Sequence, residues 1–371
     1  MPARPAVFPR TGYYHFLGKG DMHPGQVLGT WPLARWDEWF AELKEAGRDR
    51  LWFLVNGHTL AYPSVGFPGL IDPDARSARE PGFIRALVDS ARQRGFKTYA
   101  VFTTDGHALE FGKANPGLLA RDRDGKPVSE DFLCLEEPRV RDYIERQYAE
   151  VLELCPVWDG VVFHPTESSP MRFNPATAAE YKRETGGNLL ARPDAALIPW
   201  FNELYARFIA RSVEWWCSRL PRLDPVMFNC WWTNGAPDVY RGILSRETRV
   251  CVWDYDYRAV GWRSRPVARW TESFGPERII FMPSSGGYPD GRPPIDEAAM
   301  GYDRLLALAS FLGVREVVFF AGWGAGENAE IRLDRALLAA APAQPDAALL
   351  DALDADYESA RGRVVRTAGA R

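Results

Sequence analysis

Cysteines and long apolar runs are scarce in this sequence. The five cysteines are an odd number at irregular spacings, so they do not form the regular framework of a disulfide-stabilised fold. No apolar run approaches the length of a membrane span, and the first ten residues lack the hydrophobic segment of a secretory signal. These absences predict a cytoplasmic protein with reduced thiols and no membrane partner.

A strong charge of either sign is also missing. The formal net charge is -4 and the isoelectric point is near 5.9, with basic and acidic residues interspersed. A nucleic-acid-binding domain concentrates Lys and Arg on one face, so we expect no nucleic-acid partner. Aromatic residues are abundant instead, with 14 Trp, 14 Tyr and 20 Phe in 371 residues. The chain can therefore bury a large core, and the composition excludes a wholly disordered protein.

Short apolar runs alternate with helical patterns along most of the chain. Each run has the length of a strand, and each helical pattern places apolar residues on one face. The predicted strands are residues 10–17, 51–55, 96–103, 161–163, 225–230, 249–253, 278–282 and 316–320. The clearest predicted helices are residues 36–46, 83–94, 138–154, 198–220 and 298–313.

Eight such units are the number in a (β/α)8 TIM barrel. A doubly wound open sheet is the alternative, but it favours a glycine-rich phosphate loop after the first strand, and Gly18-Lys19-Gly20 lacks that spacing. We predict one barrel over residues 1–345, with long loops after the second, third and fourth strands. Residues 346–371 are predicted as a C-terminal helix and tail. An assembly of identical chains is left open.

Polar and aromatic side chains follow the predicted strands. Barrel enzymes build their active sites at the C-terminal ends of the strands, so we expect these residues to meet there. All five histidines lie in or just after the first four strands. In chain order the candidates are His15, Asp21, His58, Asp105, His107, His164, Glu167, Trp231, Trp232, Trp253, Asp254, Asp256, Trp323 and Glu327.

The fourth strand carries the most informative stretch, residues 159–167, in which an Asp-Gly turn and an apolar run precede a histidine, a proline and Glu167. Glycoside cleavage needs a carboxylic acid to protonate the leaving oxygen and a second carboxylate as base or nucleophile. We predict Glu167 as the acid, the alternative being an ion pair with Arg172. Asp254 and Asp256 stand two residues apart, so both could face the substrate as the second carboxylate; the alternative is pairing with Arg258 or Arg263.

The remaining candidates suit sugar binding. The apolar face of a pyranose packs on an indole ring, and its hydroxyl groups bind Asp, Asn and His side chains. We therefore expect substrate contacts from the histidines, Asp21, Asp105, the tryptophans and Glu327.

The fourth-strand region resembles barrel glycoside hydrolases. Residues 159–167, the following segment 174–186, the helix 83–95 and the loop 115–125 carry the likeness, which covers most of residues 11–340 as a pattern. In clan A retaining enzymes an Asn precedes the acid and the seventh strand bears a Glu, whereas this chain has Thr166 and Pro283-Ser284-Ser285. β-Hexosaminidases carry an Asp-Glu pair, whose Asp orients the acetamido group; Thr166 stands at its position.

The α-glucuronidase family is similar in pairing a fourth-strand Glu with carboxylates from later strands. This resemblance implies that Asp254 or Asp256 is the partner of Glu167. The resulting prediction is a glycoside hydrolase without cofactor or metal, acting at the end of a small glycoside or oligosaccharide.

Two other classes stay open. The first is a metal-dependent isomerase or hydrolase on the same barrel, with His58, Asp105, His107 and His164 as ligands. The second is a carbohydrate-binding barrel that retains the aromatic residues and has no catalytic activity.

Overall fold

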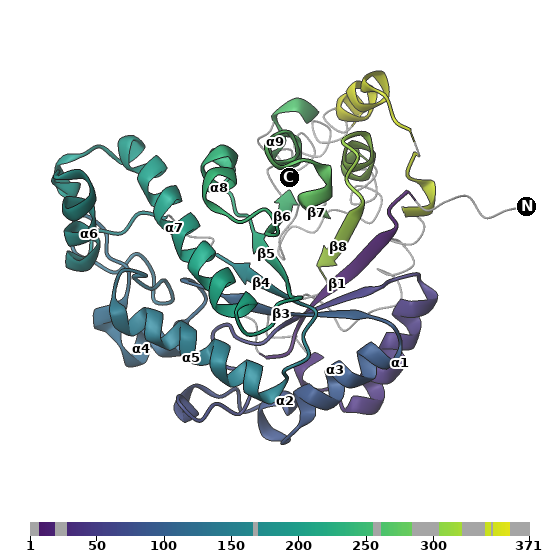
Figure 1. Cartoon of the computed structure of the whole chain (residues 1–371), viewed down its shortest axis with the longest axis horizontal. Helices are drawn as coiled ribbons and strands as arrows, with labels where there is room; N and C mark the ends of the chain where they lie inside the picture. The colour runs from purple at the N-terminus through teal and green to yellow at the C-terminus, as the bar shows by residue number, and fades with distance from the viewer. Residues whose placement is uncertain are drawn as a thin grey trace, which may run out of the picture.

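The protein is a closed barrel of eight parallel strands (Figure 1), as predicted. The computed structural model describes residues 7–18, 28–165, 170–254, 261–283, 304–320, 338–342 and 344–356. Neighbouring strands pair in chain order, and β8 closes the barrel against β1. The strands are β1 (Arg10–Phe16), β2 (Arg50–Leu54), β3 (Lys97–Thr103), β4 (Gly160–His164), β5 (Asp224–Phe228), β6 (Arg249–Asp254), β7 (Ile279–Pro283) and β8 (Glu316–Phe320).

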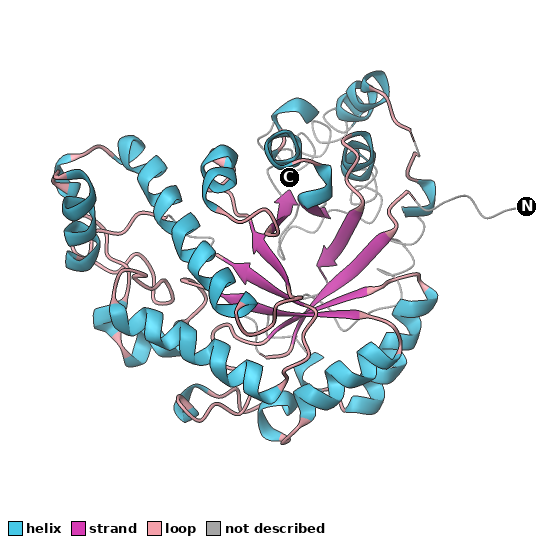
Figure 2. Ribbon diagram, viewed as in Figure 1, coloured by secondary structure: helices cyan, strands magenta, loops and turns pink. Residues whose placement is uncertain are grey.

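Helices surround the strands, as Figure 2 shows. The principal ones are α1 (Leu33–Glu45), α3 (Phe83–Gln93), α5 (Pro138–Leu154), α7 (Asp194–Cys217), α8 (Pro237–Ile243), α9 (Pro266–Phe274) and residues 304–311. Three more helices, α2 (Arg76–Arg79), α4 (Leu109–Ala114) and α6 (Pro175–Thr185), lie in the long loops after β2, β3 and β4. None of the helices in the described ranges is long and apolar enough to cross a membrane.

Strand alternation divides the core into two layers. Side chains such as Tyr14, Trp52, Val162 and Phe228 fill the barrel interior. The alternate positions pack outward against the helices in a larger cluster, which includes Phe53. Each strand is thus buried on both faces, which explains why the strands read as nearly continuous apolar runs.

A glycine accommodates the largest ring at the lower end of the interior. A Cβ atom at Gly160 would lie 2.1 Å from Cδ1 of Tyr99, so only glycine leaves room for that ring. The Tyr99 hydroxyl donates a hydrogen bond to Asp224 at 2.8 Å. This contact connects the apolar interior to the charged residues below it.

The N-terminal end of the barrel is closed by a buried ionic network, which we call the barrel floor: Arg50, Asp224, Arg249 and Glu316. Glu316 of β8 lies 2.8 Å from Nε of Arg50 and 2.6 Å from Nη1 of Arg249. Arg249 also pairs with Asp224 of β5. Because the network joins β2, β5, β6 and β8, it holds the closed arrangement of the strands.

The C-terminal helix at residues 347–356 packs on the barrel. Leu350 is fully buried in the outer cluster. Asp351 accepts a hydrogen bond from the indole of Trp262 at 2.9 Å, and Asp354 accepts one from Arg304 at 3.1 Å. The helix therefore covers part of the outer layer near α9.

Candidate active site at the C-terminal end of the barrel

His164 lies at the centre of the described part of the barrel mouth, by which we mean the C-terminal ends of the strands and the loops that follow them. Its side chain is 5% exposed and belongs to the inward-facing set of β4. The hydroxyl of Tyr14 lies 3.2 Å from its Nδ1 atom. The rings of Phe228, His107 and Trp253 have centroids 4.4, 5.7 and 6.2 Å from its own. Two imidazole rings, those of His164 and His107, thus lie beside the aromatic rings of Tyr14, Phe228 and Trp253.

Two asparagines fix the strand ends around this histidine. Oδ1 of Asn229, just after β5, accepts a hydrogen bond from the backbone nitrogen of Trp253 at 2.7 Å. Oδ1 of Asn56, just after β2, accepts one from the backbone nitrogen of Thr103 at the same distance. Each asparagine side chain thus adds one hydrogen bond between neighbouring strands, beyond the last backbone hydrogen bond of the sheet. The backbone that carries Trp253 is therefore held in place.

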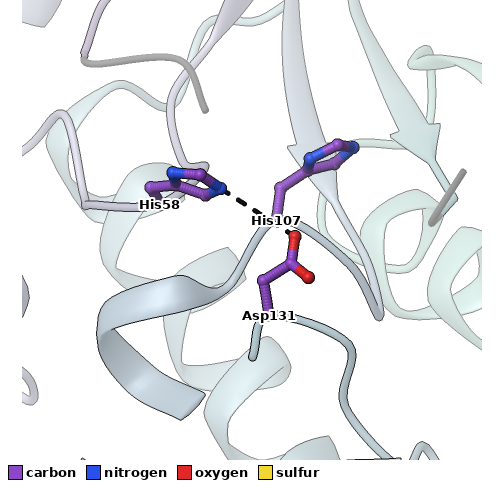
Figure 3. A group of neighbouring side chains, drawn as sticks. All are labelled: His58, His107 and Asp131. Carbon is purple, nitrogen blue, oxygen red and sulfur yellow. Dashed lines mark ion pairs between the residues drawn. The ribbon is translucent and has the colours of Figure 1, made fainter. Parts of the chain in front are cut away.

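Two further histidines and an aspartate lie beside His164 in the mouth. His58 follows β2, His107 follows β3, and Asp131 lies in the loop before α5 (Figure 3). Each side chain offers one ligand atom, and these atoms all lie within 4.8 Å of one another. Nε2 of His58 is 3.9 Å from Oδ2 of Asp131. Burial alone would raise the pKa of Asp131, but His58, Ser129 and the charge of His107 lower it to about 2.

Asp105 is completely buried at the end of β3. Its carboxylate accepts a hydrogen bond from Oγ1 of Thr104 at 2.9 Å, and that hydroxyl lies 3.0 Å from the hydroxyl of Tyr205 on α7. Thr104 thus connects Asp105 to the helix layer. It does not belong to the group formed by His58, His107 and Asp131.

Three predicted site residues lie behind the barrel wall. His15 points outward from β1 and accepts a hydrogen bond from Trp39 Nε1 of α1 at 2.9 Å. Burial lowers the pKa of His15 to about 3, so this histidine is neutral at ordinary pH. Trp232 packs edge-on against Tyr205 in the same outer layer. These positions correct the expectation of substrate contact for His15 and Trp232, because the strand wall and the helices enclose them.

Asp254 is the third predicted site residue that lies behind the barrel wall. Trp253 faces the interior of β6, so the next residue points outward, where Asp254 forms a buried ion pair with Arg265 at 2.9 Å. The prediction named Arg258 or Arg263 as its partner; Arg263 pairs with Asp351 instead, and Arg258 lies outside the described residues. By contrast Trp231, after β5, is 51% exposed and accessible to a ligand.

The alternative partner of Glu167 is engaged elsewhere. Arg172 forms a bidentate ion pair with Glu136, with both oxygen–nitrogen distances at 2.6 Å. Burial raises the pKa of Glu136, but the charge and hydrogen bonds of Arg172 outweigh burial and leave that pKa below its ordinary value. Both side chains are buried, so this pair is a structural element of the loops above β3 and β4.

Five predicted residues lie outside the described residues: Asp21, Glu167, Asp256, Trp323 and Glu327. Their roles stay predictions. Two contributors to the mouth were not predicted. Tyr14 could have been found, since it alternates with Phe16 on a strand whose inner face ends at the mouth. Asp131 carries no local signal, because the fold alone brings its loop to His58.

Comparisons with solved structures find the same barrel in other proteins. The β-N-acetylhexosaminidase from Bacteroides fragilis is 10% identical with a TM-score of 0.58, over 90% of this chain and 65% of that one. The exo-β-N-acetylglucosaminidase from Vibrio harveyi is 12% identical with a TM-score of 0.58, over 95% and 56%. The β-galactosidase from Marinomonas ef1 is 12% identical with a TM-score of 0.60, over 85% and 54%. These likenesses show a shared barrel fold.

Curated sequences give shorter matches. The human β-hexosaminidase subunit beta is 32% identical over 71 residues, which are 18% of this chain and 13% of that protein. The bovine β-hexosaminidase subunit alpha is 23% identical over 172 residues, 44% of this chain and 32% of that protein. The chain thus matches less than a third of either relative's length. No family model matches the sequence.

Proposed function

We propose that this chain is a glycoside hydrolase that releases a terminal sugar from a small glycoside, with Glu167 as the general acid. The observation that carries the proposal is the group at the end of β4. His164 lies among Tyr14, Phe228 and Trp253, three residues before Glu167 in the sequence. An aromatic surface with a few fixed polar groups suits a sugar, and the strand end is where a barrel holds its catalytic groups.

The comparisons support the same reaction class. The matching solved structures and curated relatives include β-N-acetylhexosaminidases, an exo-acting β-N-acetylglucosaminidase and a β-galactosidase. Terminal N-acetylhexosaminides are therefore the first substrates to test. Thr166 replaces the aspartate that orients the acetamido group in β-hexosaminidases. We accordingly expect weaker preference for N-acetylated sugars than that family pattern implies.

We further propose Asp256 as the second carboxylate. Asp254 is held in a buried ion pair with Arg265, and a nucleophile or base must instead reach the substrate. Arg172 is engaged by Glu136, which favours the catalytic role of Glu167 over the ion pair. A separation of about 5 Å between the two catalytic carboxyl groups gives retention of configuration, and about 6.5–9.5 Å gives inversion.

The test is hydrolysis of a panel of 4-nitrophenyl glycosides and the corresponding disaccharides by wild type and Glu167→Gln. A general acid contributes about 10²–10⁴ in rate, and it matters most when the leaving group is poor. We expect the variant to lose more kcat/KM on disaccharides than on nitrophenyl glycosides, while circular dichroism shows an unchanged fold. Full activity of Glu167→Gln on the best substrate would disprove its role. Binding without turnover across the panel would favour the carbohydrate-binding alternative.

A further inference from the structure

Three loops bring His58, His107 and Asp131 together at the barrel mouth. In Figure 3 the side chain of His58 points toward the carboxylate of Asp131, with His107 on the loop beside them. All three side chains are partly buried, and their ligand atoms lie within 4.8 Å of one another. The prediction for a metal-dependent enzyme used His58, Asp105, His107 and His164. The structure replaces Asp105 and His164 in that set with Asp131.

Backbone hydrogen bonds fix the loops that carry these side chains. The amide of Glu110 donates to the carbonyl of His58 at 3.2 Å, and the amide of Ala108 donates to the carbonyl of Asp131 at 3.1 Å. The arrangement therefore connects all three loops without depending on the side chains. A preformed backbone lowers the cost of bringing ligands to one ion.

The carboxylate of Asp131 is oriented by a second residue. Its Oδ1 atom accepts a hydrogen bond from Oγ of Ser129 at 2.6 Å, which leaves Oδ2 facing His58. Outer contacts of this kind orient metal ligands in proteins.

His107 has an unusual backbone. Its φ is +58°, in the left-handed region, and it is the one non-glycine residue with positive φ among the described residues. A positive φ is uncommon outside glycine, although histidine, like Asn and Asp, adopts it more often than most residues. The loop with this conformation carries His107 beside His58 and Asp131 (Figure 3).

We propose that His58, His107 and Asp131 bind one Zn²⁺ ion at the barrel mouth. Two imidazoles and a carboxylate are the donor set that zinc accepts, whereas Mg²⁺ and Ca²⁺ prefer oxygen alone. A tetrahedral ion with bonds of about 2.1 Å separates its ligands by about 3.4 Å. The His58–Asp131 distance of 3.9 Å needs a contraction of about 0.5 Å, and the bound of 4.8 Å on the ligand separations allows at most about 1.4 Å. Three protein ligands leave a fourth position for water or a substrate hydroxyl.

The test is direct zinc binding by the full chain, which does not depend on glycoside hydrolysis. Protein treated with chelator and desalted is titrated with ZnCl₂ by calorimetry, with MgCl₂ as the comparison. We expect one zinc per chain and no saturable magnesium binding. Bound Co²⁺ should show visible ligand-field absorption, which reports nitrogen and oxygen ligation at the ion itself.

Matched variants locate the site. His58→Gln, His107→Asn and Asp131→Asn should each weaken zinc binding by about 100-fold or more. Asn tolerates the positive φ at position 107, so that variant tests the ligand with little backbone change. His164→Gln and Asp105→Asn test the four-residue set and should weaken zinc binding less than the loss of a ligand does. Absence of a single stoichiometric site, unchanged affinity in all three ligand variants, or an equal loss in His164→Gln would overturn the proposal.

Discussion

Asp254 and Arg265 form an ion pair in which the carboxylate is fully buried and the guanidinium nearly so, with Nη1 2.9 Å from Oδ1. The pair connects the end of β6 to the residue before α9. Removing one partner of such a pair leaves a buried charge without compensation, which typically costs about 3–5 kcal/mol. Asp254 is therefore a structural residue whose loss should first reduce stability.

Asp254→Asn and Asp256→Asn should separate structural and catalytic carboxylates. We expect Asp254→Asn to lower the free energy of unfolding by about 3 kcal/mol in urea, because Arg265 keeps its buried charge. Asp256→Asn should preserve stability and lose kcat. Glu38→Gln, which removes an exposed ion pair with Arg35, is the control and should change stability by less than about 0.5 kcal/mol. A stable, inactive Asp254→Asn protein would contradict this division.

The neighbouring residues Trp231 and Trp232 offer a second matched pair. Trp231 is half exposed, while Trp232 is buried against Tyr205. Trp231→Ala should raise KM for disaccharides about 2–10-fold through lost stacking and leave stability nearly unchanged. Trp232→Ala should instead destabilise the protein by about 3–5 kcal/mol. Steady-state kinetics and urea unfolding measure both variants, and a KM effect confined to Trp232→Ala would reverse the assignment.

Tyr14 should act through His164. Its hydroxyl lies 3.2 Å from Nδ1 of that histidine, so it orients the ring and selects its tautomer. Tyr14→Phe removes one hydrogen bond of about 1 kcal/mol and should lower kcat/KM about fivefold. The expected readout is a shift of the acid or base limb of the pH–rate profile, which a purely structural role would not move. An unchanged profile would show that the contact has no part in the reaction.

His15 predicts how stability depends on pH. Burial lowers its pKa from 6.5 to about 3, so the unfolded chain binds more protons than the native protein between these values. The contribution of neutral His15 is fully present above pH 6.5 and is lost progressively as the pH falls toward 3. At pH 5 the loss is about 2 kcal/mol relative to pH 7.

His15→Gln tests this dependence, because a neutral amide can still accept from Trp39. Urea unfolding at pH 7 and pH 5 should show that the variant loses about 2 kcal/mol less than wild type over this interval. Equal losses in the two proteins would mean that His15 titrates near its ordinary pKa.

Much of the fold was predictable because every strand is buried on both faces. The predicted strand at residues 316–320 coincides with β8, and the other strands agree to within two residues. The helix predicted from Ile198 instead begins at Asp194 and contains Pro199 in its second turn. The short helices α8 and α9 were not individually predicted, although each begins with a proline at its first position, a known start signal.

The candidate site was less predictable because it depends on the direction in which each side chain points and on contacts between residues far apart in the sequence. Asp254 follows the inward-facing Trp253 and therefore points outward. The apolar run alone does not show whether the last side chain of the strand points into the barrel or away from it. His15 is polar within an aromatic strand, yet Trp39 satisfies it behind the wall. Asp131 reaches His58 only through the loop before α5. The position of a strand end along the chain is a local property, whereas the partner it meets is a property of the assembled barrel.

The barrel floor has a consequence for synthesis on the ribosome. Arg50 and Arg249 share the carboxylate of Glu316, which is translated 266 and 67 residues after them. Domains generally fold as units while the chain emerges at about 5–20 residues per second. Asp49 and Asp224 can pair with these arginines earlier, but the shared carboxylate that joins Arg50 to Arg249 arrives only with β8. A nascent chain arrested before residue 316 should stay open and bind chaperones, and release of the last strand should be the step that commits it to the native barrel.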